Sequence, residues 1–254
     1  MPHWRRAAPG VAATVTGPTP SPNIWRSPEV YERLNRAADP DGLVVAALDS
    51  VIGRVGGQRN VTVDVAVDVG CGTGYHLPML AARAERVVGV EPHTDLAAAA
   101  SRRVARARLA DRVTVRTGLA EHLPLPEESV DLVFSHWAYF FGPGCEPGLA
   151  QADRVLRPDG VQVAVDLDVT ATTGYARWFA ASGTGVRSDR AASFFSRWTQ
   201  QRLPVVWRFA DRADLAAVLG IEFPPDVAAM ALRETVGATI SVPTVLRWRH
   251  PRRT

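Results

Sequence analysis

Two kinds of segment alternate along the chain from residue 63 onward. Short runs rich in Val and Leu predict strands that are buried on both faces of a sheet, and longer runs with helical spacing of apolar residues separate them. We predict strands at residues 63–69, 86–90, 113–117, 130–135 and 161–168, and helices at 75–84, 94–109 and 147–156. This alternation predicts a parallel sheet with helices on both faces.

The segments on either side of this region carry weaker patterns. Ser27, Pro28 and Glu29 are typical of a helix start, because they offer a capping hydroxyl, a proline in the first turn and an acid at the positive end of the helix dipole. A second helix is predicted from residue 42 to about 52. Beyond residue 169 we predict helices at 170–181, 189–201, 211–219 and 225–233, and strands at 203–209 and 238–248. Pro243 should force a bulge or an edge position in the last strand.

The composition of the chain bears on its location and on the state of its cysteines. Residues 1–22 contain five prolines and two glycines, which predicts a flexible arm. Pro9 and Gly10 interrupt the only stretch that resembles a secretory signal, and no apolar run approaches the ~20 residues needed to span a bilayer. We therefore expect a cytoplasmic protein. Its two cysteines, Cys71 and Cys145, are too few for a disulfide framework or a thiolate zinc site, so we expect reduced thiols.

All 29 basic residues are arginine. The lack of lysine excludes a Schiff-base lysine and a P-loop lysine. Six arginines lie near the two ends of the chain. Without them the chain has 23 basic and 26 acidic residues, so its body is slightly acidic. We therefore expect solvated basic tails and not a nucleic-acid interface. The six are Arg5, Arg6, Arg247, Arg249, Arg252 and Arg253.

A glycine-rich turn lies where the first predicted strand meets a helix. Gly70, Gly72 and Gly74 allow a tight turn with bare backbone, and the helix start offers free amide N–H groups to an anion. A dinucleotide fingerprint would need glycine in place of Tyr75 or Leu77. Glu91 ends the next strand, where a carboxylate can accept hydrogen bonds from both hydroxyls of a ribose.

Four motifs, in this order and spacing, resemble the class I S-adenosylmethionine-dependent methyltransferases of the small-molecule type. They are Asp-Val-Gly-Cys-Gly-Thr-Gly at 68–74, Val-Gly-Val-Glu-Pro at 88–92, the stretch 118–135, and Arg-Val-Leu-Arg-Pro-Asp-Gly at 154–160. The resemblance covers about residues 65–170. It implies an α/β fold with a doubly wound (Rossmann-like), mostly parallel seven-stranded sheet and helices on both faces. We expect one domain over 23–254, with the cofactor half at about 60–168 and acceptor-side elaborations at about 23–55 and 169–235.

The resemblance also implies a set of cofactor-binding residues on the loops that follow the strands. Asp68 and the glycine backbone should hold the methionine end, Glu91 the ribose, and the N–H of Ala120 the adenine. Leu119 departs from the many relatives that carry an acid there, so Glu121 or backbone contacts should bind the adenine amine. The full set is Asp68, Gly70, Cys71, Gly72, Glu91, Pro92, Leu119, Ala120, Glu121 and Ser135.

The methyl acceptor should bind beside the loop after the fourth predicted strand. His136 lies at the carboxyl end of this strand, where ligands of α/β proteins bind, and it is a candidate general base, an orienting residue or a packing residue. We predict an acceptor pocket formed by His136, Trp137, Tyr139 and Tyr31. No metal is expected, because Ser135 stands where metal-dependent relatives carry an acid, and Asp166 and Asp168 are interpreted as solvated or structural.

The predicted function is transfer of a methyl group from S-adenosylmethionine to an O, N or C nucleophile of a small organic molecule by in-line displacement, leaving S-adenosylhomocysteine. A second aromatic-rich set of residues would either cover such a molecule or pack helices on the sheet: Trp178, Phe179, Phe194, Phe195 and Trp198. Alternatives are an RNA or protein methyltransferase recruited through the arginine tails, an NAD-type Rossmann oxidoreductase, and a non-methylating protein of the same fold.

Overall fold

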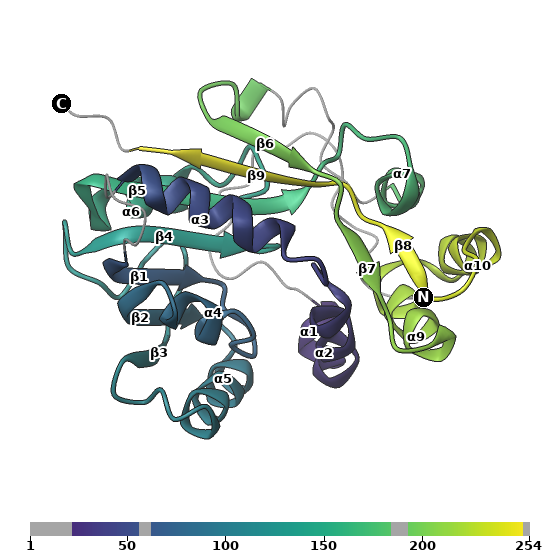
Figure 1. The fold of residues 1–254 in the computed structure, drawn as a ribbon, viewed down its shortest axis with the longest axis horizontal. Helices are drawn as coiled ribbons and strands as arrows, with labels where there is room; N and C mark the ends of the chain where they lie inside the picture. Colours follow the sequence, from purple (N-terminus) through teal and green to yellow (C-terminus); the bar gives the residue numbers. More distant parts are fainter. Residues whose placement is uncertain (1–21, 56–61, 184–192, 251–254) are drawn as a thin grey trace.

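A seven-stranded sheet is the centre of the computed structural model, which describes residues 22–55, 62–183 and 193–250 (Figure 1). All its strands are parallel except β9, which runs antiparallel to both of its neighbours. The predicted doubly wound, mostly parallel sheet is therefore confirmed. In spatial order the strands are β3 (Val113–Thr117), β2 (Ala84–Glu91), β1 (Val63–Val69), β4 (Val130–His136), β5 (Leu156–Leu167), β9 (Thr244–Arg249) and β6 (Thr199–Leu203).

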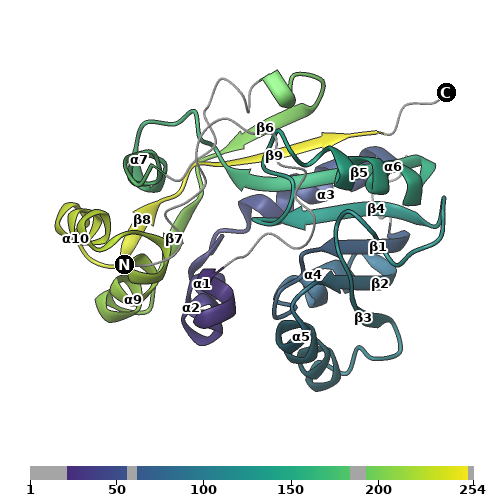
Figure 2. The same cartoon turned by 180° about the vertical axis from the view of Figure 1, so that it is seen from behind.

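Helices cover both faces of this sheet. On one face lie α3 (Leu43–Val55), α4 (Leu77–Ala81) and α5 (Thr94–Arg106), and on the other lies α6 (Glu146–Val155) (Figures 1 and 2). Along β1, Ala66 belongs to the same apolar cluster as side chains of α3, α4 and α5. Val65 and Val67 belong to the cluster that includes side chains of α6. Because a parallel strand in this position is covered on both sides, its sequence is a nearly continuous apolar run.

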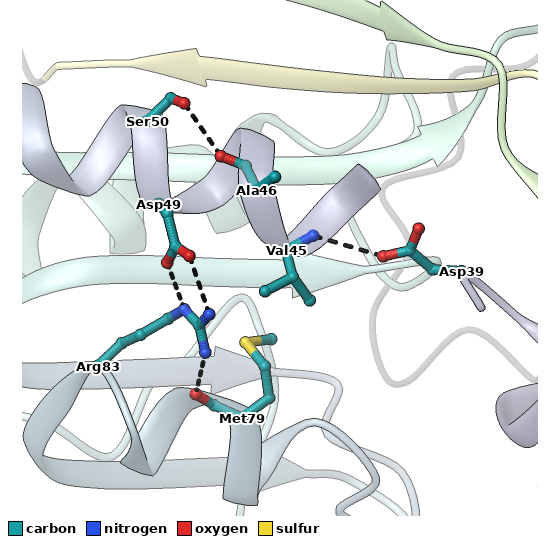
Figure 3. Close-up of polar contacts among 7 residues, drawn as sticks. All are labelled: Asp39, Val45, Ala46, Asp49, Ser50, Met79 and Arg83. Carbon is teal, nitrogen blue, oxygen red and sulfur yellow. Dashed lines mark hydrogen bonds and ion pairs between the residues drawn. The ribbon is translucent and has the colours of Figure 1, made fainter. Parts of the chain in front are cut away.

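Polar contacts fix helix α3 against the sheet (Figure 3). The Asp39 carboxylate accepts hydrogen bonds from the backbone N–H groups of Val44 at 3.0 Å and Val45 at 3.4 Å, and so caps the start of the helix. Further along, Asp49 pairs with Arg83, and Arg83 also donates to the carbonyl oxygen of Met79 at 3.0 Å. The helix is therefore joined both to the loop before it and to the segment that leads into β2.

A second group of elements lies beyond the carboxyl ends of the parallel strands (Figure 1). Its helix α2 is joined to α9 by an ion pair between Arg33 and Asp214, with an N–O distance of 3.0 Å. No helix of the described residues is long and apolar enough to cross a membrane. The members of this group are α1 (Pro22–Arg26), α2 (Pro28–Ala37), α7 (Gly174–Ala181), α9 (Arg212–Glu222), α10 (Pro225–Glu234), β7 (Val206–Arg208) and β8 (Thr239–Ser241).

Most predicted elements before residue 169 are present, with one marked difference. The predicted helix at 75–84 is reduced to the five residues of α4, because residues 72–76 form turns and Ala84 already pairs with Val63 in the sheet. At the start of α2, Ser27 occupies the cap position, but its hydroxyl makes no capping hydrogen bond. The predicted flexible arm at 1–22 lies almost wholly outside the described residues, and Pro22 begins α1.

Prolines divide the predicted strands of the carboxyl-terminal part. Pro204 separates β6 from β7, and Pro243 separates β8 from β9, because proline has no N–H to donate to a sheet. The chain changes sheets at each of these points, since β7 and β8 form a separate pair. The predicted helix at 189–201 is wrong for residues 199–201, which belong to the exposed edge strand β6, and 184–192 lie outside the described residues.

The prediction of solvated basic tails is wrong for Arg247 and Arg249. Both lie in β9, and Arg247 is 6% exposed, with its guanidinium group 3.7 Å from a carboxylate oxygen of Asp166 and 4.2 Å from the centre of the Phe195 ring. Arg249 pairs with Asp153 at 2.8 Å. Burial raises the pKa of Asp166 to about 7 and lowers that of Arg247. These arginines are therefore part of the folded sheet.

The second aromatic-rich set packs inside the protein. Trp178, Phe195 and Trp198 are buried, and the indole N–H of Trp178 donates to Glu234 at 2.7 Å. Phe195 and Trp198 lie on the same face of the sheet as α6, with ring centres 5.4 Å apart and nearly perpendicular planes. Of the two interpretations of this set, packing of helices and loops on the sheet is the one that the structure supports.

Replacing Arg247 by Leu should make stability strongly dependent on pH. The variant leaves the buried Asp166 carboxylate without its counter-charge, and the pKa of Asp166 in the folded protein then lies still further above the ~3.9 of an unfolded chain. Folding therefore favours the protonated carboxyl, and stability falls as pH rises from ~4 toward the folded pKa. We expect a loss of about 3 kcal/mol in the free energy of unfolding at pH 8 and less than half of that at pH 5, measured by urea unfolding.

Arg208→Leu is the control for this prediction. Arg208 pairs with Asp41 at 3.5 Å, and both side chains are about half exposed. Its loss should change the free energy of unfolding by less than about 1 kcal/mol at either pH. Equal losses at pH 5 and pH 8 for Arg247→Leu would contradict the account of the buried pair.

Candidate active site

A cavity of about 380 Å³ lies at the carboxyl ends of β1, β2 and β4. It is lined by the loop at 69–73, by residues 90–92 and 118–121, and by residues 136–139 and 141–145. Helices α1 and α2 contribute Ile24, Trp25, Tyr31 and Asn35 to the cavity. This is the edge of a parallel sheet at which α/β proteins bind ligands.

The glycine loop folds back onto β2. The N–H groups of Gly70 and Cys71 both donate to the carbonyl oxygen of Val90, at 2.8 and 3.1 Å. Gly70 has a φ of +77°, and a Cβ there would lie only 2.6 Å from that of Ala138. Gly72 has a φ of +54°, and a Cβ there would lie 3.0 Å from Ile24. Only glycine both adopts a positive φ readily and has no Cβ to meet these close neighbours. The loop therefore presents bare backbone to the cavity at these two positions.

Glu91 joins the glycine loop to the end of β2. It is 4% exposed, and its two carboxylate oxygens accept hydrogen bonds from the N–H groups of Gly72 at 2.9 Å and His93 at 3.0 Å. Burial raises the pKa of this carboxyl, and the two backbone donors oppose the rise. Each oxygen retains a further acceptor position. Glu91 thus lies in the cavity wall as an oriented acceptor.

Two predicted cofactor-binding residues are buried behind the cavity. Asp68 is 2% exposed and Ser135 is 1% exposed, and the side chain of neither lines the cavity. The place of Ser135 at the mouth of the cavity stays a prediction, and in this structure its side chain is buried. Burial, and secondarily the charge of Glu91, raises the pKa of Asp68 to about 7. One oxygen of Asp68 has no hydrogen-bond partner in the described chain.

The remaining predicted cofactor residues line the cavity together. They occupy the glycine loop, the turn after β2 and the loop after β3. Leu119 and His122 form a bridge that shapes the last of these loops, and Ala120 is buried within it. Leu119 and Glu121 both line the cavity. These residues are Gly70, Cys71, Gly72, Glu91, Pro92, Leu119, Ala120 and Glu121.

The predicted acceptor-pocket residues also meet at the cavity. His136, Trp137, Tyr139 and Tyr31 all line it, although Tyr31 comes from a helix about 100 residues away in the sequence. Trp137 has a φ of +50°, and its ring contacts Tyr175 and Trp207 with centroid distances of 5.5 and 5.4 Å. It therefore joins the cavity wall to the core of the carboxyl-terminal elements.

Sequence reasoning missed a histidine beside His136. His76 lines the cavity, and the centres of the two rings are 4.3 Å apart. Burial lowers the pKa of His76 to about 4, and burial together with His76 lowers that of His136. Both rings are therefore neutral at pH 7. The available signal was the position of His76, directly after the glycine turn and at the start of a helix.

A second missed feature is a polar clamp between α2 and the glycine loop. Glu32 accepts hydrogen bonds from the hydroxyl of Thr73 and from the guanidinium of Arg103, the latter at 2.5 Å. Arg103 also donates to the carbonyl oxygen of Thr73 at 3.0 Å. On the opposite side of the helix pair, Asn23 donates to Glu222 at 2.8 Å. Helices α1 and α2 are thus held over the cavity from both sides.

The two ends of the cavity differ in chemistry. The end near the glycine loop offers the Glu91 carboxylate and bare backbone, which suit a nucleoside with a charged substituent. The other end offers aromatic rings and two neutral histidines. Within the described residues, no group of three or more His, Cys, Asp or Glu side chains could hold a metal ion.

Residues 67–164 match the family model described as "Methyltransferase domain". The chain is 37% identical over 102 residues to protein arginine N-methyltransferase 1 of Schizosaccharomyces pombe, covering 38% of this chain and 29% of that protein. It is 34% identical over 97 residues to malonyl-[acyl-carrier protein] O-methyltransferase of Yersinia pestis, covering 38% of this chain and 34% of that protein. The chain thus spans about a third of the length of these curated relatives.

Solved structures share the fold. The YcgJ protein of Bacillus subtilis superimposes with a TM-score of 0.57 at 15% sequence identity, over 79% of this chain and 97% of that one. In this chain the shared fold carries a glycine loop after β1 and a carboxylate at the end of β2. Residues 67–164 therefore match a methyltransferase domain, and the described chain shares the fold of this solved structure.

Proposed function

We propose that the chain transfers a methyl group from S-adenosylmethionine to an O, N or C nucleophile of a small organic molecule. The observation that carries this proposal is the cavity that has the glycine loop and Glu91 at one end and His136 with aromatic rings at the other. A nucleoside cofactor and a small acceptor can meet in such a cavity.

The residues at the first end fit this cofactor. Glu91 has acceptor positions left for the ribose hydroxyls, and the bare backbone at Gly72 leaves room for the amino-acid end. Asp68 is buried two residues before Gly70 with one unpartnered oxygen, behind the end that would hold the charged amino group. Ala120 and Glu121 lie where the adenine would be held, and Leu119 would pack on its face.

The protein's part in the reaction is positioning and exclusion of water. S-adenosylmethionine, when bound, supplies an electrophilic methyl group on a sulfonium centre. Tyr31 and Trp137 line the acceptor end with apolar surface, which keeps water from the reacting atoms. Holding the nucleophile in line with the methyl group removes much of the entropic barrier.

The glycine spacing argues against a dinucleotide cofactor. Tyr75, which stands where the fingerprint would need its third glycine, lines the cavity beside the loop. Isothermal titration calorimetry tests this point directly, because S-adenosylhomocysteine should bind the wild-type protein saturably and NADH should not. Binding of NADH without binding of S-adenosylhomocysteine would replace the proposal by the oxidoreductase alternative.

Glu91→Gln should weaken S-adenosylhomocysteine binding by about 1–3 kcal/mol, the range for a buried hydrogen-bond acceptor that is lost. The amide keeps the size of the side chain, but its nitrogen cannot accept from Gly72 or His93. Calorimetry measures the affinity, and circular dichroism checks that the variant is folded. Glu85→Gln is the matched control, because Glu85 lies on the same strand and is exposed. Unchanged affinity in folded Glu91→Gln would remove Glu91 from the site.

Gly70→Ala should lower the affinity for S-adenosylhomocysteine at least about tenfold, because the new methyl group would push Ala138 away and distort the loop. Gly42→Ala separates this effect from backbone strain. Gly42 has a φ of +70°, close to that of Gly70, but a Cβ there meets nothing within 4 Å. Gly42→Ala should lose about 1 kcal/mol of stability in thermal unfolding from backbone strain alone, and Gly70→Ala should lose more because of the added contact with Ala138. A similar loss of affinity in both variants would contradict the role of the loop.

A further inference from the structure

The charges around the cavity limit what its acceptor end can bind. Among the described residues that line the cavity, Glu91 and Glu121 carry charge and none is arginine, the one basic residue type of this chain apart from histidine. The nearby Arg103 already binds Glu32 and the backbone of Thr73. An acceptor with a phosphate or carboxylate would therefore be buried without a counter-charge, which costs several kcal/mol.

A positively charged acceptor would also lack a partner. The carboxylates behind the acceptor end are both engaged by protein donors: Glu222 accepts from the Tyr175 hydroxyl at 2.6 Å and from Asn23 at 2.8 Å. Glu32 accepts from Thr73 and Arg103. Of the carboxylates that do line the cavity, Glu91 lies at the cofactor end, and Glu121 acts on the Tyr139 hydroxyl, whose pKa is raised by burial and by this carboxylate. The acceptor end is thus suited to an uncharged molecule.

The shape and surface of this end favour a planar molecule. Its lining is aromatic, with Tyr31 from α2 and Trp137 and Phe141 from the loop after β4. Phe141 is 46% exposed, so the aromatic lining continues to the surface. Flat rings that stack or meet edge to face gain about 0.5–1.5 kcal/mol beyond the burial of area.

The two neighbouring histidines supply a proton acceptor in this apolar surrounding. The His76 and His136 rings lie 4.3 Å apart, and both line the cavity. A neutral imidazole has one N–H donor and one nitrogen lone pair, so the pair can orient a hydroxyl and accept one proton. Two charged rings at this distance would repel each other, and the pair therefore takes a single proton.

We propose that the acceptor is an uncharged, planar molecule with an ionisable hydroxyl group, such as a phenol, and that His76 and His136 together take its proton. This inference rests on the proposed methyl transfer. As the hydroxyl O–H bond breaks, the proton passes to a histidine nitrogen. The oxygen forms a bond to the methyl carbon, the carbon–sulfur bond breaks, and its electron pair stays on sulfur. The proton is later released to water, so the products are the methyl ether, S-adenosylhomocysteine and one proton.

Three probes of one size test the acceptor class. Protein saturated with S-adenosylhomocysteine is titrated by calorimetry with 2-naphthol, 2-naphthyl phosphate and 2-naphthylmethylamine, which are neutral, anionic and cationic near pH 7. We expect 2-naphthol to bind at least about tenfold more tightly than either charged probe. Equal or tighter binding of a charged probe would overturn the inference, and so would the failure of 2-naphthol to bind.

Variants test the histidine pair. His76→Ala and His136→Ala should each weaken 2-naphthol binding about tenfold, because a hydrogen-bond acceptor is lost, and leave S-adenosylhomocysteine binding unchanged. His122→Ala is the control, since His122 is exposed and does not line the cavity. With S-adenosylmethionine, transfer to 2-naphthol should fall at least about 100-fold in His136→Ala. Wild-type values in both histidine variants would refute the role of the pair.

The two levels of the proposal fail in different ways. If wild-type protein does not bind S-adenosylhomocysteine, methyl transfer itself is refuted. If it binds S-adenosylhomocysteine but prefers 2-naphthyl phosphate or the amine, only the acceptor class and the histidine pair are refuted, and the proposed function stands.

Discussion

The contact of Glu91 with the glycine loop determines how the two halves of the site meet. One buried carboxylate accepts the N–H of Gly72 and the N–H of His93, and so it joins the ends of two adjacent strands. Because the N–H groups of Gly70 and Cys71 both donate to the carbonyl oxygen of Val90, the loop is held against β2, and its glycines bring no side chain to the cavity. The position of the loop in turn allows Ala138, and with it the wall that carries His136, to approach closely.

The fold could be predicted because its strands carry a strong signal. Runs such as Val63–Val69 are apolar on both faces, as central parallel strands must be, and the helices between them show helical spacing. The errors lie where tertiary contacts outweigh local pattern. Residues 199–201 have no apolar stripe, and they become a strand because β9 offers them a partner. Arg247 was assigned to a tail on composition alone, and only the position of β9 between β5 and β6 explains its burial.

The cofactor side of the site was predictable because its residues follow one another at fixed places on successive strands, and a motif records such places. The acceptor side was predictable only in part. His136 and Trp137 follow β4 directly, but His76, Asn35 and the Glu32–Arg103 clamp belong to separate elements that meet only in the folded chain. Asp68 and Ser135 illustrate the opposite case, since the motif includes them although both side chains are buried behind the cavity.

The position of β9 has a consequence for the order of folding during synthesis. β9 follows every other described strand in the sequence, yet it lies between β5 and β6. As a ribosome releases the chain, the five parallel strands can assemble early, while β6 has no neighbour in the main sheet until β9 emerges and inserts. Until then one edge of β5 exposes unpaired backbone groups to other chains. The nascent protein is therefore most exposed to aggregation in the interval between the release of β6 and that of β9.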